Sequence, residues 1–509
     1  MLPIEQKTSY WFFGHRWVLI AALILIFGTA TGIRLYDLTD LPLDFAPTRQ
    51  LFSVLKARSM YYASLPASAD IPIWQREVAA RQMTPLIEPP VMETLVALTY
   101  RITGEHLWIA RIYSALFWVL AGIFLFLLAR ELASSEAAVI SLLFYLFLPH
   151  GVIASRSFQP DPLMTALIVA GAWGLYRWHS TRTWGWAVVA GLLMGAAIFV
   201  KNMAVFPLGM AALALVLEHG WRDSLKNAQT WGVALMGLLP VMIYTLYGVY
   251  IAGFLGKQFG MRFFPELWST GGFYLRWLGQ ITEIVSFGTI AMAIVGIFVA
   301  ERRGMALLAG LWLGYLTFGM TFAYFVASHE YYNLMLVPLV ALSLAPVVDL
   351  FIKRAQSLRI GSISRAVLSL LIVLVVAIQI WNVRVELVRE NWRSDPEFWT
   401  MLGEKLGHNS GKVLALSQDY GGRLAYWGWQ DVESWYYSGD LELRTLDDRS
   451  INLLQRFLDA ARGKQYFVVT QVNKLDAQPV IKDYVYQHYP VFSEGQGYII
   501  FDLAHPKAP

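Results

Sequence analysis

Repeated apolar segments constrain the fold of this chain more than any other feature. A first apolar run extends from Trp17 to about Ile33, and segments of about 15 to 23 residues recur after it. A helix needs about 20 apolar residues to cross the hydrocarbon core of a bilayer. The further segments lie near 112–129, 137–154, 162–178, 185–200, 203–217, 231–252, 277–300, 304–326, 331–352 and 366–383. Together with the first run, taken as a retained span, they predict about eleven transmembrane helices.

The composition agrees with a membrane protein. Of the 509 residues, 57% are hydrophobic and 15% are charged, against roughly 45–50% and 25% in soluble domains. The net charge of +4 comes from short basic clusters between apolar segments, not from one stripe, so no nucleic-acid partner is predicted. The chain has no cysteine, which excludes disulfides and thiolate sites.

The basic clusters indicate the orientation of the chain in the membrane. They contain Arg130; Arg177 and Arg182; Arg222 and Lys226; Arg302 and Arg303; and Lys353, Arg354, Arg359 and Arg365. All fall on one set of alternate loops, which the positive-inside rule assigns to the cytoplasm. The first loop and loops 155–161, 200–203, 253–276 and 326–330 are then extracytoplasmic. An odd number of spans places the C-terminal tail on that side as well.

Two long regions lie between or after the apolar segments. The first loop, residues 34–111, is far longer than an ordinary connection. Its portions 51–62 and 91–103 read as amphipathic helices on the membrane surface. In the tail, 412–417, 465–470 and 497–502 read as strands and 451–462 as a helix. We therefore predict a polytopic α-helical membrane protein, with residues 1–385 as the transmembrane catalytic domain and 386–509 as a small extracytoplasmic α/β domain.

Asp44 is the first candidate for chemistry. It follows the first span and lies between Pro42 and Pro47, whose fixed φ angles stiffen the backbone. A carboxylate held there could act as a general base toward an acceptor hydroxyl. The alternative is an acid that is simply solvated at the membrane surface.

Other polar residues stand at the extracytoplasmic ends of spans. Asp161 lies between two prolines at the start of a span, where it is either a second functional acid or a helix cap. Arg156 could pair with Asp161 or bind a phosphate. Lys201 ends an apolar run, where it either snorkels to the surface or binds a phosphate. Lys257, Arg262 and Arg276 add positive charge to the same side.

A polar and aromatic group precedes the span that contains Pro338. It consists of His329, Glu330, Tyr331 and Tyr332. Adjacent His and Glu side chains point in different directions, so they are a weak metal signal. Hydrogen bonding to a polar ligand and an interfacial aromatic belt are the two other interpretations.

These motifs, in this order and on this side, resemble the GT-C superfamily of polyprenyl-phosphate-sugar-dependent glycosyltransferases. The branch is that of protein O-mannosyltransferases and the lipid A aminoarabinose transferase, and the resemblance covers nearly the whole chain. It is carried by Asp44, by the run from Glu88-Pro-Pro through Gly104 to Ala110-Arg-Ile-Tyr, by Arg156 with Asp161, by Gly195-Ala-Ala-Ile-Phe-Val-Lys201, and by His329-Glu-Tyr-Tyr332 before Pro338.

The resemblance implies sugar transfer from a polyprenyl-phosphate-linked donor to a lipid, glycan or protein hydroxyl, by inverting single displacement at the outer face of a bacterial inner membrane. Asp44 is the implied base, and Asp161 is a second acid that orients the acceptor or the loop. The basic residues expected at the donor phosphate are Lys201, Arg58, Arg156 and Arg262, and those expected to line the substrate cavity are Arg49, Glu88, His329, Tyr331 and Tyr332.

Several features limit this expectation. Protein O-mannosyltransferases have an Asp-Glu pair where this chain has Asp44-Phe45, which argues against a protein acceptor. The first loop has no Asp-x-Asp motif, so no metal is expected, and no glycine-rich nucleotide loop is present, so no cofactor is expected. A transporter or flippase of a lipid-linked sugar is the main alternative, although repeated halves are not evident. A scaffold that recruits partners through aromatic residues of the tail, such as Tyr426 and Trp429, is another.

Overall fold

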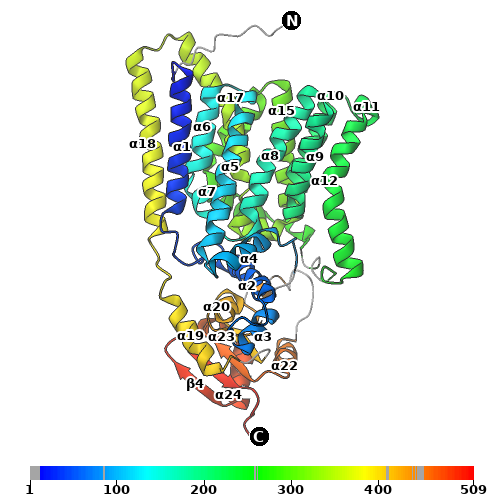
Figure 1. Cartoon of the computed structure of the whole chain (residues 1–509), viewed down its shortest axis with the longest axis vertical. Coiled ribbons are helices and arrows are strands. Elements are labelled where there is room, and N and C mark those ends of the chain that lie inside the picture. The colour runs from blue at the N-terminus through cyan, green and yellow to red at the C-terminus, as the bar shows by residue number, and fades with distance from the viewer. Residues whose placement is uncertain are drawn as a thin grey trace.

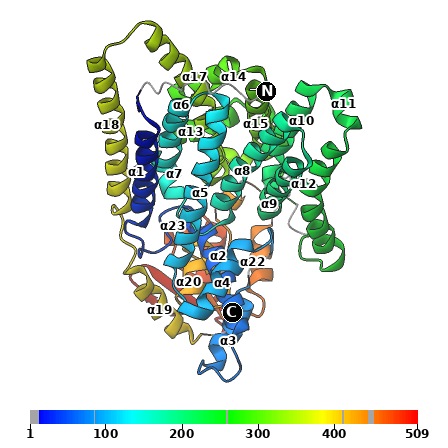
Figure 2. The ribbon, with the colours of Figure 1, turned by 45° about the horizontal axis from the view of Figure 1, so that its top comes forward.

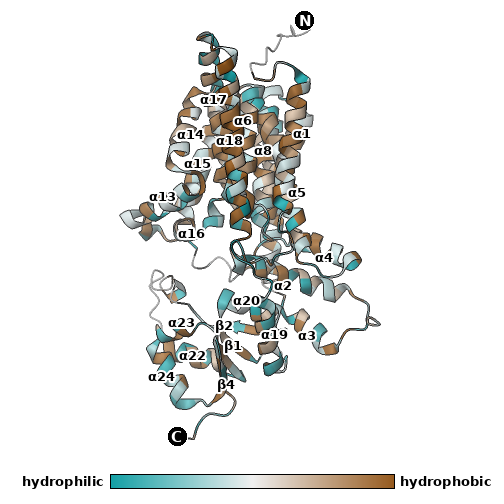
Figure 3. Ribbon diagram, turned by 90° about the vertical axis from the view of Figure 1, so that its left-hand side faces the viewer, coloured by the Kyte–Doolittle hydropathy of each residue, from teal (hydrophilic) through white to brown (hydrophobic). Residues whose placement is uncertain are grey.

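The computed structural model describes residues 12–83, 86–256, 260, 262–408, 412–437, 439–441, 443 and 452–508. Figure 1 shows a bundle of long helices at one end and a smaller domain with a sheet at the other. Apolar residues dominate the bundle, while the smaller domain is mixed in character (Figure 3). The expected class, a polytopic α-helical membrane protein with a small α/β domain, is confirmed.

The bundle is built from thirteen helices among the described residues. They are α1 (Arg16–Leu35), α5 (Trp108–Leu132), α6 (Ser135–Phe147), α7 (Pro149–Ala154), α8 (Pro160–Thr181), α9 (Trp184–Val200), α10 (Val205–His219), α12 (Ala228–Leu246), α13 (Gly271–Val285), α14 (Phe287–Val299), α15 (Arg302–Thr321), α17 (Leu336–Ser357) and α18 (Ser362–Leu387). Shorter elements connect them: η1 (Asn202–Ala204), α11 (Trp221–Lys226), η2 (Tyr247–Ile251), η3 (Pro265–Ser269), α16 (Ala323–Ser328) and η4 (Glu330–Asn333). Helices α1 and α18 run beside each other along one edge (Figures 1 and 2).

The number of spans stays a prediction. Within the described residues, 7 helices are long and apolar enough to cross a membrane, or up to 8 if the bent pair α13–α14 is one span. The predicted segments 137–154 and 185–200 contain the shorter apolar helices α6 and α9, of 13 and 17 residues. Pro149 begins a new short helix, so α6 ends before the segment does.

The predicted span 277–300 is bent in the structure. Helices α13 and α14 meet there at 90°. Ser286 lies between them with φ 60°, outside the helical region, and its hydroxyl accepts a hydrogen bond from the amide of Thr289. A serine in this role caps the second helix. The average hydropathy of the segment does not reveal such a turn, because it is set by the many apolar residues on both sides.

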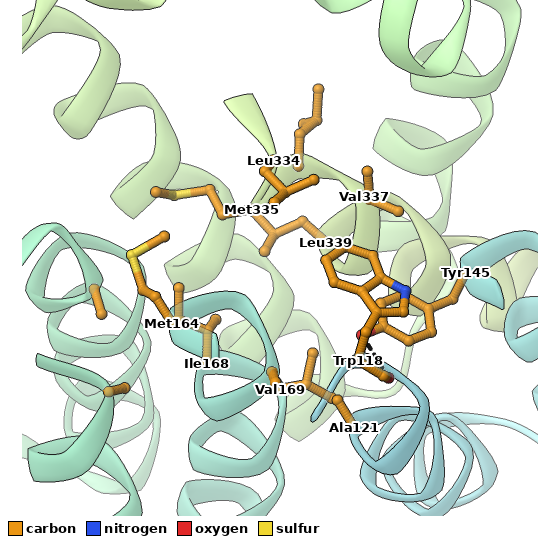
Figure 4. Packing of buried hydrophobic residues seen from close by; sticks show 14 of the residues in the cluster. Trp118, Ala121, Tyr145, Met164, Ile168, Val169, Leu334, Met335, Val337 and Leu339 are labelled. Carbon is orange, nitrogen blue, oxygen red and sulfur yellow. Dashed lines mark hydrogen bonds between the residues drawn. The ribbon is translucent and has the colours of Figure 1, made fainter. Parts of the chain in front are cut away.

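The bundle core surrounds α17, the most deeply buried of the candidate spans. Trp118 of α5 stacks on Tyr145 of α6 with ring centroids 4.8 Å apart, and residues of α8 and α17 pack around the pair (Figure 4). Helices α10 and α15 approach closely, because Gly314 lies against the backbone of Phe206 and Pro207. This packing fixes the helix ends at which the polar residues lie.

Three helices of the first loop lie between the bundle and the smaller domain. They are α2 (Pro47–Ser64), α3 (Ile73–Arg81) and α4 (Val91–Thr103), and they are seen below the bundle in Figure 1. Residues 50–59 of α2 are buried, except Phe52, which is partly exposed. Helix α2 is therefore covered along most of this stretch, unlike the surface helix expected from its sequence.

The C-terminal domain contains a mixed five-stranded sheet in the order β2-β1-β3-β5-β4. The strands are β1 (Val413–Leu416), β2 (Val432–Ser434), β3 (Tyr466–Val469), β4 (Val491–Gly495) and β5 (Tyr498–Asp502), and the helical elements are α19 (Asp395–Leu406), η5 (Gln418–Gly421), α20 (Gly422–Tyr426), α22 (Leu453–Ala461), α23 (Val472–Asp476) and α24 (Pro479–His488). Strand β1 is parallel to β2 and β3, whereas β5 is antiparallel to β3 and β4. Apolar clusters form on both faces, around Phe467 on one and Trp399 on the other.

Candidate active site

Four segments that are distant in sequence meet where the bundle faces α2. They are the loop that carries Asp44, the turn 155–161 before α8, the η1 turn that follows Lys201, and η4 before α17. Each lies at the end of a helix that is fixed in the bundle. The predicted polar residues of these segments are thereby brought together, whereas Arg58 lies elsewhere.

Asp44 is held by one of its two carboxylate oxygens. Arg111 Nη2 donates to Oδ1 at 3.0 Å, and Gln50 Nε2 donates to the same oxygen at 3.4 Å. Among the described residues no hydrogen bond reaches Oδ2, and the side chain is 21% exposed. The left-handed Ala46, φ 44°, and then Pro47 turn the chain directly into α2. One oxygen is thus fixed and the other is available.

Gln50 joins the Asp44 loop to the turn before α8. Its Nε2 donates to the carbonyl of Phe45 at 2.7 Å, and its Oε1 accepts from the amide of Phe158 at 2.8 Å. The side chain is fully buried. Arg111 joins the same loop to α5 by donating to the carbonyl of Leu41 at 2.6 Å.

Arg156 does not pair with Asp161. It donates through Nη2 to the carbonyl of Asp37 at 3.0 Å. Its Nε and Nη1 are buried and have no hydrogen-bond partner among the described residues. Burial, together with the positive charge of Arg111, lowers the pKa of Arg156 to about 10.

The partner of Asp161 is Lys201. The ammonium lies 2.7 Å from Oδ1 and 2.9 Å from Oδ2, and the two side chains are 2% and 1% exposed. The rings of Tyr331 and Tyr332 lie 5.5 and 5.4 Å from the same ammonium. Lys201 therefore does not snorkel to the surface, because its charge is buried against a carboxylate and two aromatic rings.

Two cavities lie on either side of an ion pair between Arg49 and Glu88, whose atoms are 3.3 Å apart. The Glu88 cavity, about 250 Å³, is bordered by Glu88, Asn202, Tyr244 and Arg262 together with apolar residues that include Phe199 of α9 and Val241 of α12. The Tyr420 cavity, about 320 Å³, is bordered by Ala46, Pro47, Thr48, Arg49, Gln280, Ser328, His329, Glu330, Tyr331 and Tyr420. Arg49, Glu88, His329 and Tyr331 thus line cavities, while Asp44 lies two residues from the wall of the second.

The electrostatics around Glu88 are dominated by cations. Burial by itself raises the pKa of this carboxyl. The positive charges around it outweigh burial and lower the pKa; they belong to Arg49, Lys201, Lys56 and Arg262. A carboxylate with a lowered pKa is a weak base and a good counter-ion. Glu88 is therefore suited to hold cations in place, and the surroundings suit an anionic ligand.

Arg58 lies at a different place from the expected one. Its Nε contacts Glu105 at 2.9 Å, and its guanidinium stacks on the rings of Tyr426 and Trp429 at 3.5 and 4.1 Å. These contacts join α2 to the C-terminal domain. A phosphate ligand at Arg58 would have to replace them.

Histidine and carboxylate side chains do not gather into a metal centre within the described part of the chain, where no group of three or more was found. His329 contacts the hydroxyl of Ser328 at 2.8 Å, and burial lowers the pKa of its imidazole. Its place in the wall of the Tyr420 cavity agrees with the polar-ligand interpretation of this segment.

Three residues of the site received no role from sequence. Arg111 stands in the quoted motif Ala110-Arg-Ile, and an arginine at the start of an apolar span is itself a signal. Gln50 and Tyr420 carry no comparable signal, because their importance depends on contacts with residues far along the chain.

Comparison with solved structures defines the fold. The crystal structure of ArnT from Cupriavidus metallidurans in the apo state aligns with 96% of this chain and 100% of its own, with a TM-score of 0.60 and 16% identity. Residues 87–247 match the sequence family described as dolichyl-phosphate-mannose-protein mannosyltransferase. This chain therefore has the GT-C fold.

Two further structures extend the likeness of this GT-C protein. The structure of ArnT bound to undecaprenyl phosphate aligns with 96% of this chain and 99% of the ArnT chain, with a TM-score of 0.59 and 16% identity. The structure of the archaeal oligosaccharyltransferase AglB from Archaeoglobus fulgidus, in complex with an inhibitory peptide and a dolichol-phosphate, is also similar. It aligns with 97% of this chain and 75% of its own, with a TM-score of 0.53 and 13% identity. No curated protein sequence matches this GT-C chain.

Proposed function

We propose that this GT-C protein transfers a sugar from a polyprenyl-phosphate-linked donor to an acceptor hydroxyl on the extracytoplasmic side of the membrane. The observation that carries the proposal is the pair of cavities beside buried cations, at the bundle end that also carries Asp44. Polyprenyl-phosphate ligands in ArnT and AglB, which share the fold, support a donor of this class.

The donor is assigned to the Glu88 cavity. Its wall combines apolar residues of the bundle helices, such as Phe199 and Val241, with the cation Arg262. Lys201 and Arg49 add positive charge close to Glu88. Apolar walls suit a prenyl chain, and the cations stabilise the phosphate as it leaves.

Asp44 is the proposed base. The acceptor oxygen attacks the anomeric carbon, the bond from that carbon to the phosphate oxygen breaks, and the phosphate leaves with the electron pair. Asp44 Oδ2 takes the proton of the acceptor hydroxyl. Arg111 and Gln50 hold the opposite oxygen, so the carboxylate does not need to reorganise during the step.

The sidedness follows from the charge of the opposite end. Helix α11, which contains Arg222 and Lys226, lies at the bundle end away from α2 and the sheet (Figure 1). Arg302 contacts Glu218, which precedes α11 by a few residues. The positive-inside rule assigns that end to the cytoplasm. Asp44 and the C-terminal domain are then extracytoplasmic in a bacterial inner membrane.

The test separates transfer from transport. Purified protein in detergent is supplied with sugar-linked polyprenyl phosphates and with extracted envelope lipids as acceptors, and products are followed by mass spectrometry. A transferase releases polyprenyl phosphate and forms a glycosylated product without a closed membrane. A flippase forms neither, and that result, with movement of the intact donor in vesicles, would replace this proposal.

A further inference from the structure

The C-terminal domain contributes Tyr420 to the wall of the Tyr420 cavity. The remaining wall comes from the start of α2, from Gln280 of α13 and from residues 328–331. Tyr420 is 41% exposed although it lies at this junction. We infer that Tyr420 is a positioning residue that holds the ring of a carbohydrate acceptor, an inference that rests on the proposed function.

The backbone holds Tyr420 in an uncommon conformation. Asp419 and Tyr420 have φ 52° and 55°, and Gly421 follows with φ 79°. An aromatic residue with left-handed backbone is disfavoured, and such residues persist where the surroundings determine them and cluster at functional sites. A Cβ atom on Gly421 would come within 2.6 Å of Val432, so this close turn requires the glycine.

Surrounding side chains fix the turn on both sides. Arg423 pairs with Asp419 at 2.5 Å and with Asp395 at 3.0 Å. Thr48 donates to Asp419 at 3.2 Å, so the turn is joined to α2 four residues after Asp44. The position of Tyr420 is therefore coupled to the loop that holds the proposed base.

The ring of Tyr420 is also fixed. Its hydroxyl donates to Asp440 at 3.0 Å, its amide donates to the hydroxyl of Tyr437 at 3.2 Å, and the two rings are 4.5 Å apart. A ring held in this way offers a flat apolar surface at little entropic cost. Sugar rings present C–H groups that pack on such surfaces.

Unsatisfied polar atoms complete the match to a carbohydrate. Arg49 Nε and Gln280 Oε1, both on residues that border the cavity, are buried and have no hydrogen-bond partner among the described residues. One is a donor and the other an acceptor, and a sugar hydroxyl can satisfy both kinds. The volume of about 320 Å³ is at the low end of roughly 300–1,000 Å³ for small-molecule sites, which suits a sugar ring.

Tyr420→Asn is the decisive variant. Asparagine adopts the left-handed conformation readily, so the turn is kept while the ring is lost. Binding of methyl β-glucoside and methyl β-glucosaminide to the full-length protein is measured by saturation-transfer NMR. We expect the dissociation constants to rise about tenfold in Tyr420→Asn, while Tyr420→Phe retains binding within about twofold of wild type. Tyr486→Asn, at an exposed tyrosine of α24, is the matched control.

Equal binding by wild type and Tyr420→Asn, or no binding of either glycoside by wild type, would overturn the inference. The outcome is independent of the transfer assay. Glycoside binding that depends on Tyr420 in a protein without transferase activity would refute the proposed function and retain the pocket, whereas transfer without a Tyr420 effect would refute this inference alone.

Discussion

Asp44 differs from Asp161, whose two oxygens both contact Lys201, because only one oxygen of Asp44 is fixed, by Arg111 and Gln50. Asp44→Asn keeps the size of the side chain and removes the basic oxygen. We expect turnover to fall by roughly a hundredfold to ten-thousandfold, with thermal stability and donor binding nearly unchanged. Initial rates with a polyprenyl-phosphate sugar measure the effect.

A matched control lies in the same loop. Asp37 pairs with Arg393 at 2.5 Å, and its left-handed backbone, φ 48°, tolerates asparagine. Asp37→Asn should retain activity within about threefold. A near wild-type rate for Asp44→Asn would remove Asp44 as the base.

The Lys201–Asp161 pair combines a structural and a functional role. Lys201→Ala leaves the Asp161 carboxylate buried without its cation. Breaking a buried ion pair in this way lowers the free energy of unfolding by roughly 3–5 kcal/mol. The double variant Lys201→Met/Asp161→Leu should recover most of this stability, because it buries no charge, yet it should still bind the donor at least about tenfold more weakly.

Thermal unfolding and donor binding, measured on the same samples, separate the two roles. If the double variant regains both stability and donor affinity, the pair is structural only. If Lys201→Ala alone is as stable as wild type, the buried geometry of the pair is wrong.

At the scale of elements, the close approach of α10 and α15 sets the position of the cavity walls. A Cβ atom on Gly314 would lie 2.4 Å from backbone atoms of Phe206 and Pro207. Gly314→Ala should therefore force the helices apart and destabilise the protein by roughly 1–3 kcal/mol. Gly28→Ala in α1, where nothing lies within 4 Å, should be neutral or slightly stabilising. Thermal unfolding in detergent compares them, and equal midpoints would contradict the packing.

The docking of α2 on the C-terminal domain depends on Arg58, which lies against Tyr426, Trp429 and Glu105. Arg58→Met should expose this junction to protease several times faster than wild type, because a buried ion pair and two stacking contacts are lost. Direct donor affinity should stay within about twofold, since Arg58 does not border the Glu88 cavity. A selective loss of donor affinity, with unchanged proteolysis, would return Arg58 to the phosphate role.

At the scale of the whole molecule, the orientation in the membrane can be tested directly. The chain has no cysteine, so single cysteines can be introduced without removing native ones. Positions 70 and 462, both exposed at the end that carries the sheet, should react with an impermeant thiol reagent from outside intact cells. Position 222, at the opposite end, should react only after permeabilisation. The reverse pattern would invert the topology.

The local composition of the sequence was enough to predict the helical bundle, three strands and several candidate site residues. Continuous apolar runs predicted the bundle. Strands β1, β3 and β5 were evident because they consist of short apolar runs, in which every strand residue except Asp502 is buried. Strands β2 and β4 were missed, since they lie at the sheet edges, none of their residues is buried, and they lack that signal. Asp44, Lys201 and the segment 329–332 were found because a polar residue at the end of an apolar run is conspicuous.

Only the tertiary structure decided which of these residues meet. Asp161 pairs with Lys201, 40 positions away, and not with the nearby Arg156. Arg58 contacts a domain more than 300 positions later, and Tyr420 reaches a cavity whose other wall residues all lie between positions 46 and 331. The bend at Ser286 interrupts a segment that is long and apolar enough to be taken for one span. Apolar content is a property of a segment and can be read from it, whereas the partner of a charge is chosen by the packing of helices that bring distant loops together.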